Sequence, residues 1–444
     1  MARFAKVGAG LGGAAATFGA NAMFGGGDAE ARNARALKET LGQLKGPLMK
    51  VAQMFATVPD LLPPEFATEL AELQTNAPAM GPAFVRRRMA AELGPDWAAR
   101  FAAFDLTPSA AASLGQVHRA TSLDGRSLAV KLQYPDMQSA VESDLGQLRA
   151  ILAIGRRMFG SIDTREVLDE LSERLREELD YDHEAKAMAL YRTFFAGRDD
   201  IAVPDSDPDL STSRLLTMEW LDGRGLTAFK TADQKTRDHV AKLLFEGWWD
   251  PLIKIGVIHG DPHLGNYSFA GEADRLNLLD FGCIRVFPPR FVGGVVKLHR
   301  SIVAGDRVGE REAYEAWGFK GLSDDLMDVL GIWARFIYGP LLDDRVRRID
   351  DQGRPADYGR ETAQKVHRRL KELGTVTVPS EFVFMDRAAI GLGGVFMHLA
   401  AELNWRRLFG EMIEGFTEDS LAARQSAALL RAGLEPPASP TLIA

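Results

Sequence analysis

Polar and apolar positions indicate helices in the first part of the chain. Between Ala29 and Lys45, leucines recur at helical spacing, and Asp28 precedes them at an N-cap position. Gly46-Pro47 should end this helix, because glycine and proline both weaken a helix interior. The pattern then predicts three shorter helices, at Leu48–Val58, Pro64–Gln74 and Pro82–Leu93.

The pattern then becomes that of strands. Ser109–His118 predicts a turn of small residues between two strands, and Asp124-Gly125 is a typical hairpin turn. Leu128–Gln133 predicts the next strand. Two further strands should flank Asp209–Ser213, the second of them at Arg214–Trp220.

Helical spacing also appears between these strands and dominates after them. Met137–Phe159 and Asp163–Phe194 each predict a helix, and the buried stripe of the second is marked by Leu168, Leu171, Leu175 and Leu179. Beyond Gly223 the chain should be mostly helical, apart from one small hairpin. A strand-rich part with helical insertions, followed by a helical part, is the element order of an α+β, bilobal, protein-kinase-like fold.

Composition shifts divide the chain into five segments. Val7–Gly27 carries no charge, but its glycine runs weaken a helix, so a flexible or membrane-surface segment is favoured over a spanning helix. The segments are a Gly- and Ala-rich stretch at 1–27, a helical extension at 28–103, a lobe with strands and a helical insertion at 104–222, a helical lobe with the catalytic and metal loops at 223–433, and a proline-containing tail, expected to be disordered, at 434–444.

Composition narrows the possible functions. The 444 residues carry a net charge of −8, which argues against a general nucleic-acid binder. Cys283 is the single cysteine, so an internal disulfide is excluded and a reducing, cytoplasmic compartment is expected. As Cys283 follows an Asp-Phe-Gly triplet, it should lie near the predicted nucleotide site, where a small packed side chain is favoured over a reactive thiol.

The strongest chemical signal is an Asp, an Asn and a second Asp in order. Asp261 stands in His-Gly-Asp, Asn266 follows five residues later, and Asp280 opens the Asp-Phe-Gly triplet. In kinase-like phosphoryl transfer, the first Asp orients or deprotonates the acceptor, while the Asn and the second Asp hold Mg²⁺ against the ATP phosphates. Either triplet alone could be a capped turn. Together, with a lysine upstream, they predict an ATP and Mg²⁺ site.

Upstream residues complete this hypothesis. Lys131 ends an Ala-Val-Lys strand, the position of the lysine that contacts the α- and β-phosphates, although a lysine on an exposed strand edge is the alternative. Glu178 borders an apolar helical stripe, where an unpaired carboxylate is costly, so we expect it to pair with Lys131. We expect Asp180 to serve a second role near the metal or a lysine. The phosphate loop is Ala-rich instead of Gly-rich, and its residues are Ala110, Ala111, Ala112 and Ser113.

Several other clusters point to structural roles. His259 and His263 should bond to backbone groups instead of holding a metal. Trp248 and Trp249 precede the catalytic loop on a predicted helix and should belong to the core. Asn404–Arg407 is a candidate interfacial Trp-Arg patch.

Over Ala29–Phe409 the chain resembles the UbiB-type, AarF-related atypical kinases. Lys50-Val51-Ala52-Gln53 stands at the family's KxGQ signature, with Ala in place of Gly, and Ser109–Val117 matches its Ala-rich loop. Glu178-Leu179-Asp180 matches its ExD motif, followed by Glu184-Ala185. Met218-Glu219 is similar to the hinge that meets adenine. Its catalytic and metal positions match Asp261, Asn266 and Asp280.

The resemblance implies a restricted active site and a limited set of reactions. In this family the KxGQ helix covers the cleft, so Lys50 and Gln53, together with Asp180, are the implied gating residues. Members bind ATP with Mg²⁺ and are similar to ATPases or small-molecule kinases that support ubiquinone or isoprenoid-lipid metabolism. The implied partners are a quinone-precursor lipid or membrane surface and proteins of ubiquinone biosynthesis, with a location peripheral to the inner membrane.

Two alternatives stay open. His-Gly-Asp, with Gly where protein kinases carry Arg, is also similar to small-molecule phosphotransferases of the aminoglycoside- and choline-kinase type. A non-catalytic, nucleotide-dependent scaffold would bind nucleotide without turnover. The complete set of Asp261, Asn266 and Asp280 argues against the scaffold, because a retired site can lose these groups without unfolding.

Overall fold

The structure is a computed structural model that describes residues 80–139 apart from 113, 175–349 apart from 262, and 379–436, with scattered single residues between these ranges. The predicted helices before Pro82, the segment 1–27 and most of the predicted tail lie outside the described residues. By their contacts, the residues divide into two compact units. The first is Met1–Asp182 with Asp207–Trp220, and the second is His183–Ser206 with Leu221–Ala444.

An antiparallel sheet forms the centre of the first unit. Its strand order is β1-β3-β4-β6, and β2 pairs with the other end of β3. The turn at Asp124-Gly125 joins β3 to β4 as predicted, and Gly125 has the positive φ of 88° that favours glycine there. The strands are β1 Phe101–Phe104, β2 Ala110–Ala112, β3 Gly115–Ser122, β4 Ser127–Gln133 and β6 Leu215–Glu219.

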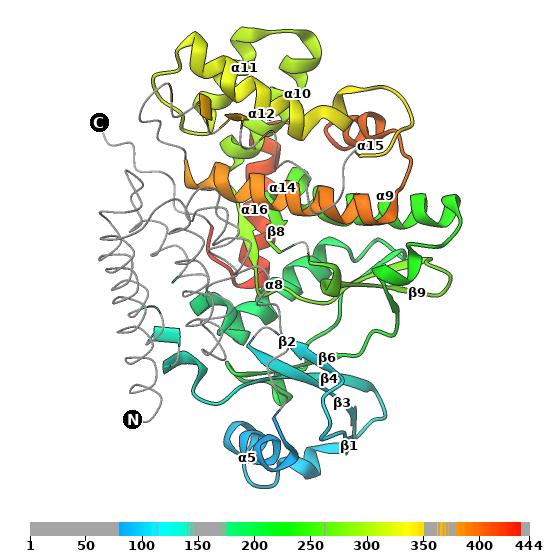
Figure 1. Cartoon of the computed structure of the whole chain (residues 1–444). Coiled ribbons are helices and arrows are strands. Elements are labelled where there is room, and N and C mark those ends of the chain that lie inside the picture. The colour runs from blue at the N-terminus through cyan, green and yellow to red at the C-terminus, as the bar shows by residue number, and fades with distance from the viewer. Residues whose placement is uncertain are drawn as a thin grey trace, which may run out of the picture. The chain divides into compact units, whose positions relative to one another are not determined.

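Helix α5 packs on one face of this sheet (Figure 1). It spans Pro82–Leu93, as the sequence predicts, and starts with proline at its first position, where a missing N–H costs nothing. Val85 and Met89 are fully buried on this helix and join a core cluster with Val130 of β4. The short 3₁₀ helix Trp97–Arg100 then leads into β1.

The predicted continuous helix Asp163–Phe194 is wrong at one point. A helical turn ends at Leu179, and a new helix, α8, begins at Tyr181 and runs to Phe194. Asp180 lies at the break, where its Oδ1 accepts a hydrogen bond of 3.0 Å from the backbone N–H of Asp182. An Asp in this place satisfies an N–H that a new helix leaves unpaired, so the chain can change direction here.

The second unit contains two small sheets. The larger has the order β5-β10-β9-β7, and β8 pairs with β11 in the other. β5 directly precedes β6 in the chain, but it pairs in parallel with β10 of the second unit. β5 and β6 therefore belong to different units although they are neighbours in sequence. The strands are β5 Ile201–Ala202, β7 Arg224–Gly225, β8 Val257–His259, β9 Tyr267–Ala270, β10 Arg275–Leu278 and β11 Ile284–Val286.

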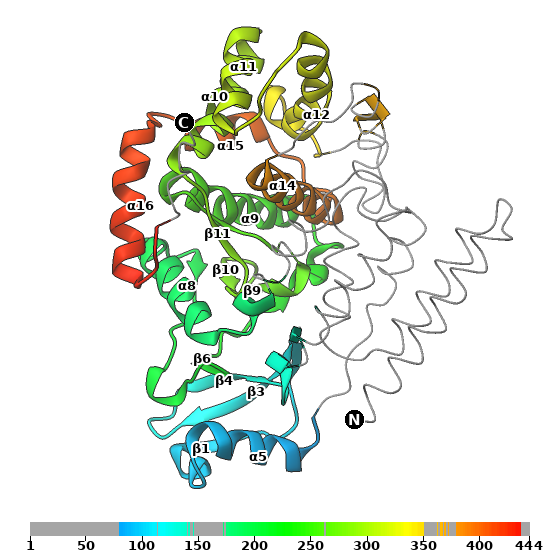
Figure 2. The same cartoon turned by 90° about the vertical axis from the view of Figure 1, so that its left-hand side faces the viewer.

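Helices make up the rest of the second unit, as predicted. Helix α9 is capped by Asp233 and ends at Gly256 in the left-handed conformation, and helices α14 and α16 lie against it (Figure 2). None of the described helices has the length and apolarity needed to cross a membrane. The helices are α9 Gln234–Ile255, α10 Pro289–Ala304, α11 Arg307–Ala316, α12 Asp324–Leu342, α14 Ser380–Leu399, α15 Trp405–Met412 and α16 Glu418–Ala432.

The tryptophans of this unit are buried. Trp248 and Trp249 belong to the core, which confirms the prediction. The predicted interfacial patch at Asn404–Arg407 is wrong for its aromatic member. Trp405 is fully buried and donates from Nε1 to the carbonyl oxygen of Arg347 at 2.9 Å, so the patch keeps only its polar side chains at the surface.

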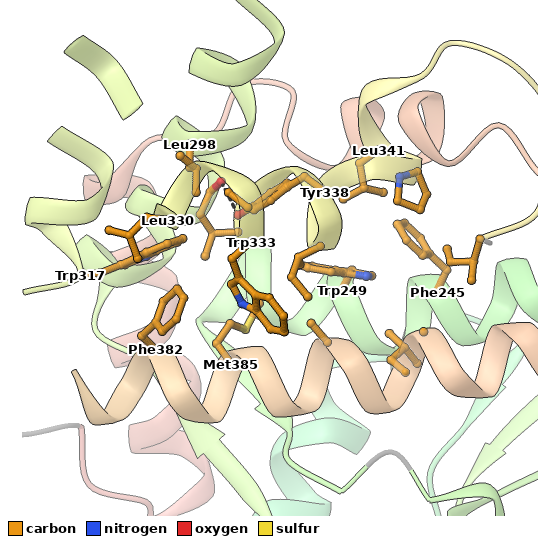
Figure 3. A pocket seen from close by; sticks show the side chains of 18 of the residues that line it. Phe245, Trp249, Leu298, Trp317, Leu330, Trp333, Tyr338, Leu341, Phe382 and Met385 are labelled. Carbon is orange, nitrogen blue, oxygen red and sulfur yellow. Dashed lines mark hydrogen bonds between the residues drawn. The ribbon is translucent and has the colours of Figure 1, made fainter. Parts of the chain in front are cut away.

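A cavity of about 70 Å³ lies among α9, α10, α12 and α14 (Figure 3). Its wall is mainly aromatic and aliphatic, and the predicted site residues that the structure describes do not line it. Two buried tyrosines of the wall differ in their hydroxyl groups. Tyr338 donates to the carbonyl oxygen of Val295 at 3.1 Å, whereas the hydroxyl of Tyr314 has no hydrogen-bond partner among the described residues.

This difference predicts opposite effects of one substitution. Tyr314→Phe should raise the free energy of unfolding by about 1 kcal/mol, because it removes a buried hydroxyl that is desolvated without gaining a bond. Tyr338→Phe should lower it by about 1 kcal/mol, because a bond is lost. Urea unfolding of both variants measures these changes. A loss of stability in Tyr314→Phe would show that its hydroxyl is bonded in solution.

Candidate active site

Two antiparallel strand pairs, β8–β11 and β9–β10, hold the predicted catalytic and metal loops. The catalytic loop, residues 260–266, runs from the end of β8 to the start of β9, and the metal loop, residues 279–283, runs from β10 to β11. His259 is paired with Ile284 at one end of the loops, and Tyr267 is paired with Leu278 at the other end. Because both ends are tied together, the two loops must lie side by side.

Backbone hydrogen bonds continue this pairing into the loops. The N–H of Leu279 donates to the carbonyl oxygen of Asn266 at 3.0 Å, and the N–H of Gly260 donates to that of Cys283 at 2.6 Å. A Cβ built on Gly260 would lie 2.9 Å from the same Cys283 oxygen. Glycine is therefore required at this position by the close approach of the loops.

His259 joins the two loops through its ring. Its Nε2 lies 2.7 Å from the carbonyl oxygen of Asp280, and its Nδ1 accepts from the N–H of Asp261 at 3.2 Å. A carbonyl can only accept, so Nε2 carries the proton and the ring is neutral. The prediction that His259 bonds to backbone is confirmed, and His263 behaves likewise by accepting from the N–H of Gly265.

Hydrogen bonds orient the side chains of both predicted metal residues. Asn266 donates from Nδ2 to the carbonyl oxygen of Asp261 at 2.9 Å, which leaves its Oδ1 as the atom that can ligate a cation. Asp280 accepts at Oδ1 from the N–H of Gly282 at 3.0 Å, which orients its carboxylate. Among the described residues no group of three or more His, Cys, Asp or Glu forms a self-sufficient metal site. Proteins usually bind Mg²⁺ through one or two side chains plus substrate phosphates and water.

Tyr267 is a residue of this site that the sequence analysis missed. It follows Asn266 directly, its side chain is buried, and within the described part of the chain its hydroxyl has no hydrogen-bond partner. Burial raises the pKa of this phenol, and the negative charges of Asp261 and Asp280 raise it further. The hydroxyl therefore stays protonated. An aromatic residue directly after the metal Asn is the one signal that could have identified it.

Glu184 is a second missed residue. Its side chain is only 1% exposed, and its Oε1 lies 3.5 Å from the N–H of Phe281 in the Asp-Phe-Gly triplet. Glu184 follows the ExD motif in the sequence, where no role was predicted for it. Glu178 is half-buried in the first unit, on the turn that precedes Asp180. Its pairing with Lys131 stays a prediction.

Lys131 is buried on a central strand. It is 8% exposed on β4, which lies between β3 and β6, so the alternative of an exposed edge lysine is wrong. Its Nζ lies 5.2 Å from the ring centroid of Tyr181, within reach of a cation–π contact. Its contact with the ATP phosphates stays a prediction.

The predicted turn at Ser109–His118 is too long, because most of these residues form two paired strands, β2 and the first part of β3. β2 contains Ala110, Ala111 and Ala112, and these pair with Val117, Gln116 and Gly115 of β3. Glu219 ends β6 opposite Leu128 and is exposed, and its contact with adenine stays a prediction. Ser113, Lys50 and Gln53 lie outside the described residues.

Comparison with known proteins gives a consistent result. A family model described as "ABC1 atypical kinase-like domain" matches residues 72–313. The chain is 29% identical over 402 residues to "Atypical kinase coq-8, mitochondrial" of Caenorhabditis elegans, covering 88% of the chain and 52% of that protein. It is 27% identical to "Atypical kinase COQ8, mitochondrial" of Saccharomyces cerevisiae, covering 62% and 56%. The chain thus spans about half the length of these curated relatives.

A solved structure extends the match to the fold. The complex of Rv3197 with erythromycin from Mycobacterium tuberculosis superposes with a TM-score of 0.60 at 26% identity, covering 86% of this chain and 96% of that one. Together with the family match, this confirms the predicted α+β, kinase-like fold.

Proposed function

Because the chain belongs to the ABC1 atypical kinase-like family, we propose that it binds Mg-ATP and uses it in ATP hydrolysis or phosphoryl transfer that supports ubiquinone or isoprenoid-lipid metabolism. The observation that carries this proposal is the pair of loops joined by His259, which brings Asp261, Asn266 and Asp280 together. Relatives named atypical kinases of the COQ8 type support the metabolic assignment.

Each residue has a defined part in the proposed reaction. Lys131 contacts the α- and β-phosphates, and the backbone around Glu219 receives the adenine. Asn266 and Asp280 hold the Mg²⁺, which when bound neutralises charge on the phosphates. Asp261 orients the attacking hydroxyl or water and accepts its proton. The buried, neutral His259 keeps the backbones of Asp261 and Asp280 at a constant separation.

The small-molecule phosphotransferase alternative loses its main support. It rested on glycine in His-Gly-Asp, where protein kinases carry Arg. In this structure the carbonyl oxygen of Cys283 leaves no room for a Cβ at Gly260, which accounts for the glycine without reference to the acceptor.

A quinone-precursor lipid or a membrane surface is the partner that we propose, together with proteins of ubiquinone biosynthesis and a location peripheral to the inner membrane.

Thermal unfolding with and without Mg-ATP tests nucleotide binding. At a nucleotide concentration of 100 Kd, the wild type should gain about 2.7 kcal/mol, seen as a concentration-dependent rise in Tm. Asp280→Asn should lose most of this rise, because it removes the carboxylate charge that holds Mg²⁺. Asp199→Asn makes the same change at an exposed position of the same unit and should keep the full rise. An unchanged rise in Asp280→Asn would contradict the assignment of the metal site.

A further inference from the structure

A continuous series of hydrogen bonds lies next to the Ala-rich loop. The N–H of Met80, the first described residue, donates to Oε1 of Gln116 at 2.7 Å. The side-chain amide nitrogen of Gln116 lies 2.8 Å from Nε2 of His118, and His118 Nδ1 lies 2.8 Å from the carbonyl oxygen of Asp105. Gln116 and His118 are both 0% exposed. We refer to these four residues as the relay.

The relay lies on the face of the sheet opposite to Lys131. Val117 is paired with Lys131, so those two side chains share one face, and Gln116 and His118 point to the other because side chains alternate along a strand. That second face is the one that α5 covers, since His118 is paired with Val130 of the core cluster. The backbone of Gln116 is also paired with Ala111 of the Ala-rich loop.

The groups at the two ends of the relay determine which of its atoms carry protons. The carbonyl oxygen of Asp105 can only accept, so His118 carries its proton on Nδ1 and its Nε2 is an acceptor. The Gln116 amide must therefore turn its NH₂ toward His118 and its oxygen toward Met80, whose N–H can only donate. Every polar side-chain atom of Gln116 and His118 thus has a partner. The relay is complete only with a neutral imidazole.

Protonation of His118 would break the relay whichever way the amide is turned. A proton on Nε2 would face the NH₂ of Gln116, and turning the amide would instead place that NH₂ against the N–H of Met80. Burial lowers the pKa of His118, which favours the neutral ring, and Phe104 stacks on it with ring centroids 5.3 Å apart. The carboxylate of Asp105 is the charged group whose field reaches this ring, and it acts in the opposite direction.

We propose that Gln116 and His118 are positioning residues that connect the Ala-rich nucleotide loop to Met80, just before the start of α5. The inference rests on the proposed nucleotide binding, because its consequence is a loop held ready for phosphates. A backbone that approaches phosphates must be held in place, and the alanines themselves offer no side-chain hydrogen bond for this purpose. The relay supplies the bonds from the other face of the sheet.

The first test removes the polar groups and keeps the volume. Gln116→Met should weaken binding of a fluorescent ATP analogue with Mg²⁺ by about threefold to tenfold, the equivalent of one net hydrogen bond. Val130→Ala, on the same buried face but outside the relay, serves as the control and should leave this affinity unchanged despite its own loss of stability. Equal affinities of Gln116→Met and wild type would overturn the inference, and so would an equal loss in Val130→Ala.

The second test reverses the sign of a pH dependence. In the wild type, lowering the pH protonates His118 and breaks the relay, so ATP-analogue affinity should fall. In Gln116→Glu, one carboxylate oxygen can accept from the N–H of Met80. The other oxygen faces His118 Nε2, and it can form a hydrogen bond there only if this nitrogen carries a proton. The carboxylate raises the pKa of His118, so affinity in this variant should rise from about pH 8 to about pH 6. A purely structural residue would give both proteins the same direction of change, which would refute the proposal.

Hydrogen exchange separates failure of the relay from failure of the proposed function. The Met80 amide should exchange at least about tenfold faster in Gln116→Met than in the wild type, with or without nucleotide. If that holds while the wild type binds no ATP analogue, the relay exists but the proposed nucleotide site is wrong. If Met80 exchanges equally in both proteins, the relay is absent in solution and the inference fails.

Discussion

Replacing Asp261 by Asn should reduce ATP turnover by about 10²- to 10⁴-fold, the range for loss of a positioned acid–base group. The substitution removes only the carboxylate. The N–H of residue 261 can still bond to His259, and its carbonyl oxygen can still accept from Asn266, because both contacts use backbone atoms. The loop should therefore keep its conformation, and ATP should still bind.

Phosphate release from Mg-ATP, with and without anionic liposomes, measures this effect. The control is Asp199→Asn, which makes the same charge change on an exposed turn and should turn over ATP like the wild type. Thermal shifts with Mg-ATP show whether Asp261→Asn keeps its binding. Release by Asp261→Asn at the wild-type rate would remove Asp261 from the reaction. Binding without release in every variant, the wild type included, would support the scaffold alternative.

Gly115→Ala should lower the free energy of unfolding by about 3 kcal/mol, at the upper end of the range for overpacked positions. A Cβ built on Gly115 would lie 3.0 Å from the carbonyl carbon of Leu132 and closer still to its oxygen. It would also lie 3.2 Å from the Cα of Gln133. All of these are backbone atoms of β4, so no side chain can move aside, and the β3–β4 pairing next to Lys131 must open.

Urea unfolding of Gly115→Ala measures this loss. Gly197→Ala is the matched control, because no atom of the described residues lies within 4 Å of its added Cβ and its φ is not positive. That variant should unfold within about 0.5 kcal/mol of the wild type. If both variants unfold at the same urea concentration, the separation of β3 and β4 adapts to a methyl group. The glycine of the Ala-rich loop then has no steric role.

Glu178 and Glu184 show the limit of periodicity. A border position on a helical stripe pointed to Glu178 as the important carboxylate. The structure buries Glu184 completely, against the N–H of Phe281. Helical spacing could not rank the two, because the helix breaks at Asp180 and the stripe before the break does not continue after it.

Local features of this protein were determined by its sequence alone. The helix Pro82–Leu93 and the hairpin at Asp124-Gly125 follow from residue preferences over a few positions. The order and spacing of Asp261, Asn266 and Asp280 are covalent properties of the chain, so the amino-acid sequence is enough to identify the candidate site. The kinase-like fold was predicted from the same order of elements and motifs.

Only the tertiary structure decided which distant residues meet. The pairing of β5 with β10, the burial of Lys131 and Trp405, and the relay through Gln116 and His118 all depend on contacts between residues far apart in the chain. The relay shows the physical reason most clearly. A Gln and a His on a strand have many possible partners, and only the packing of α5 and β1 around them supplies one donor and one acceptor and excludes water.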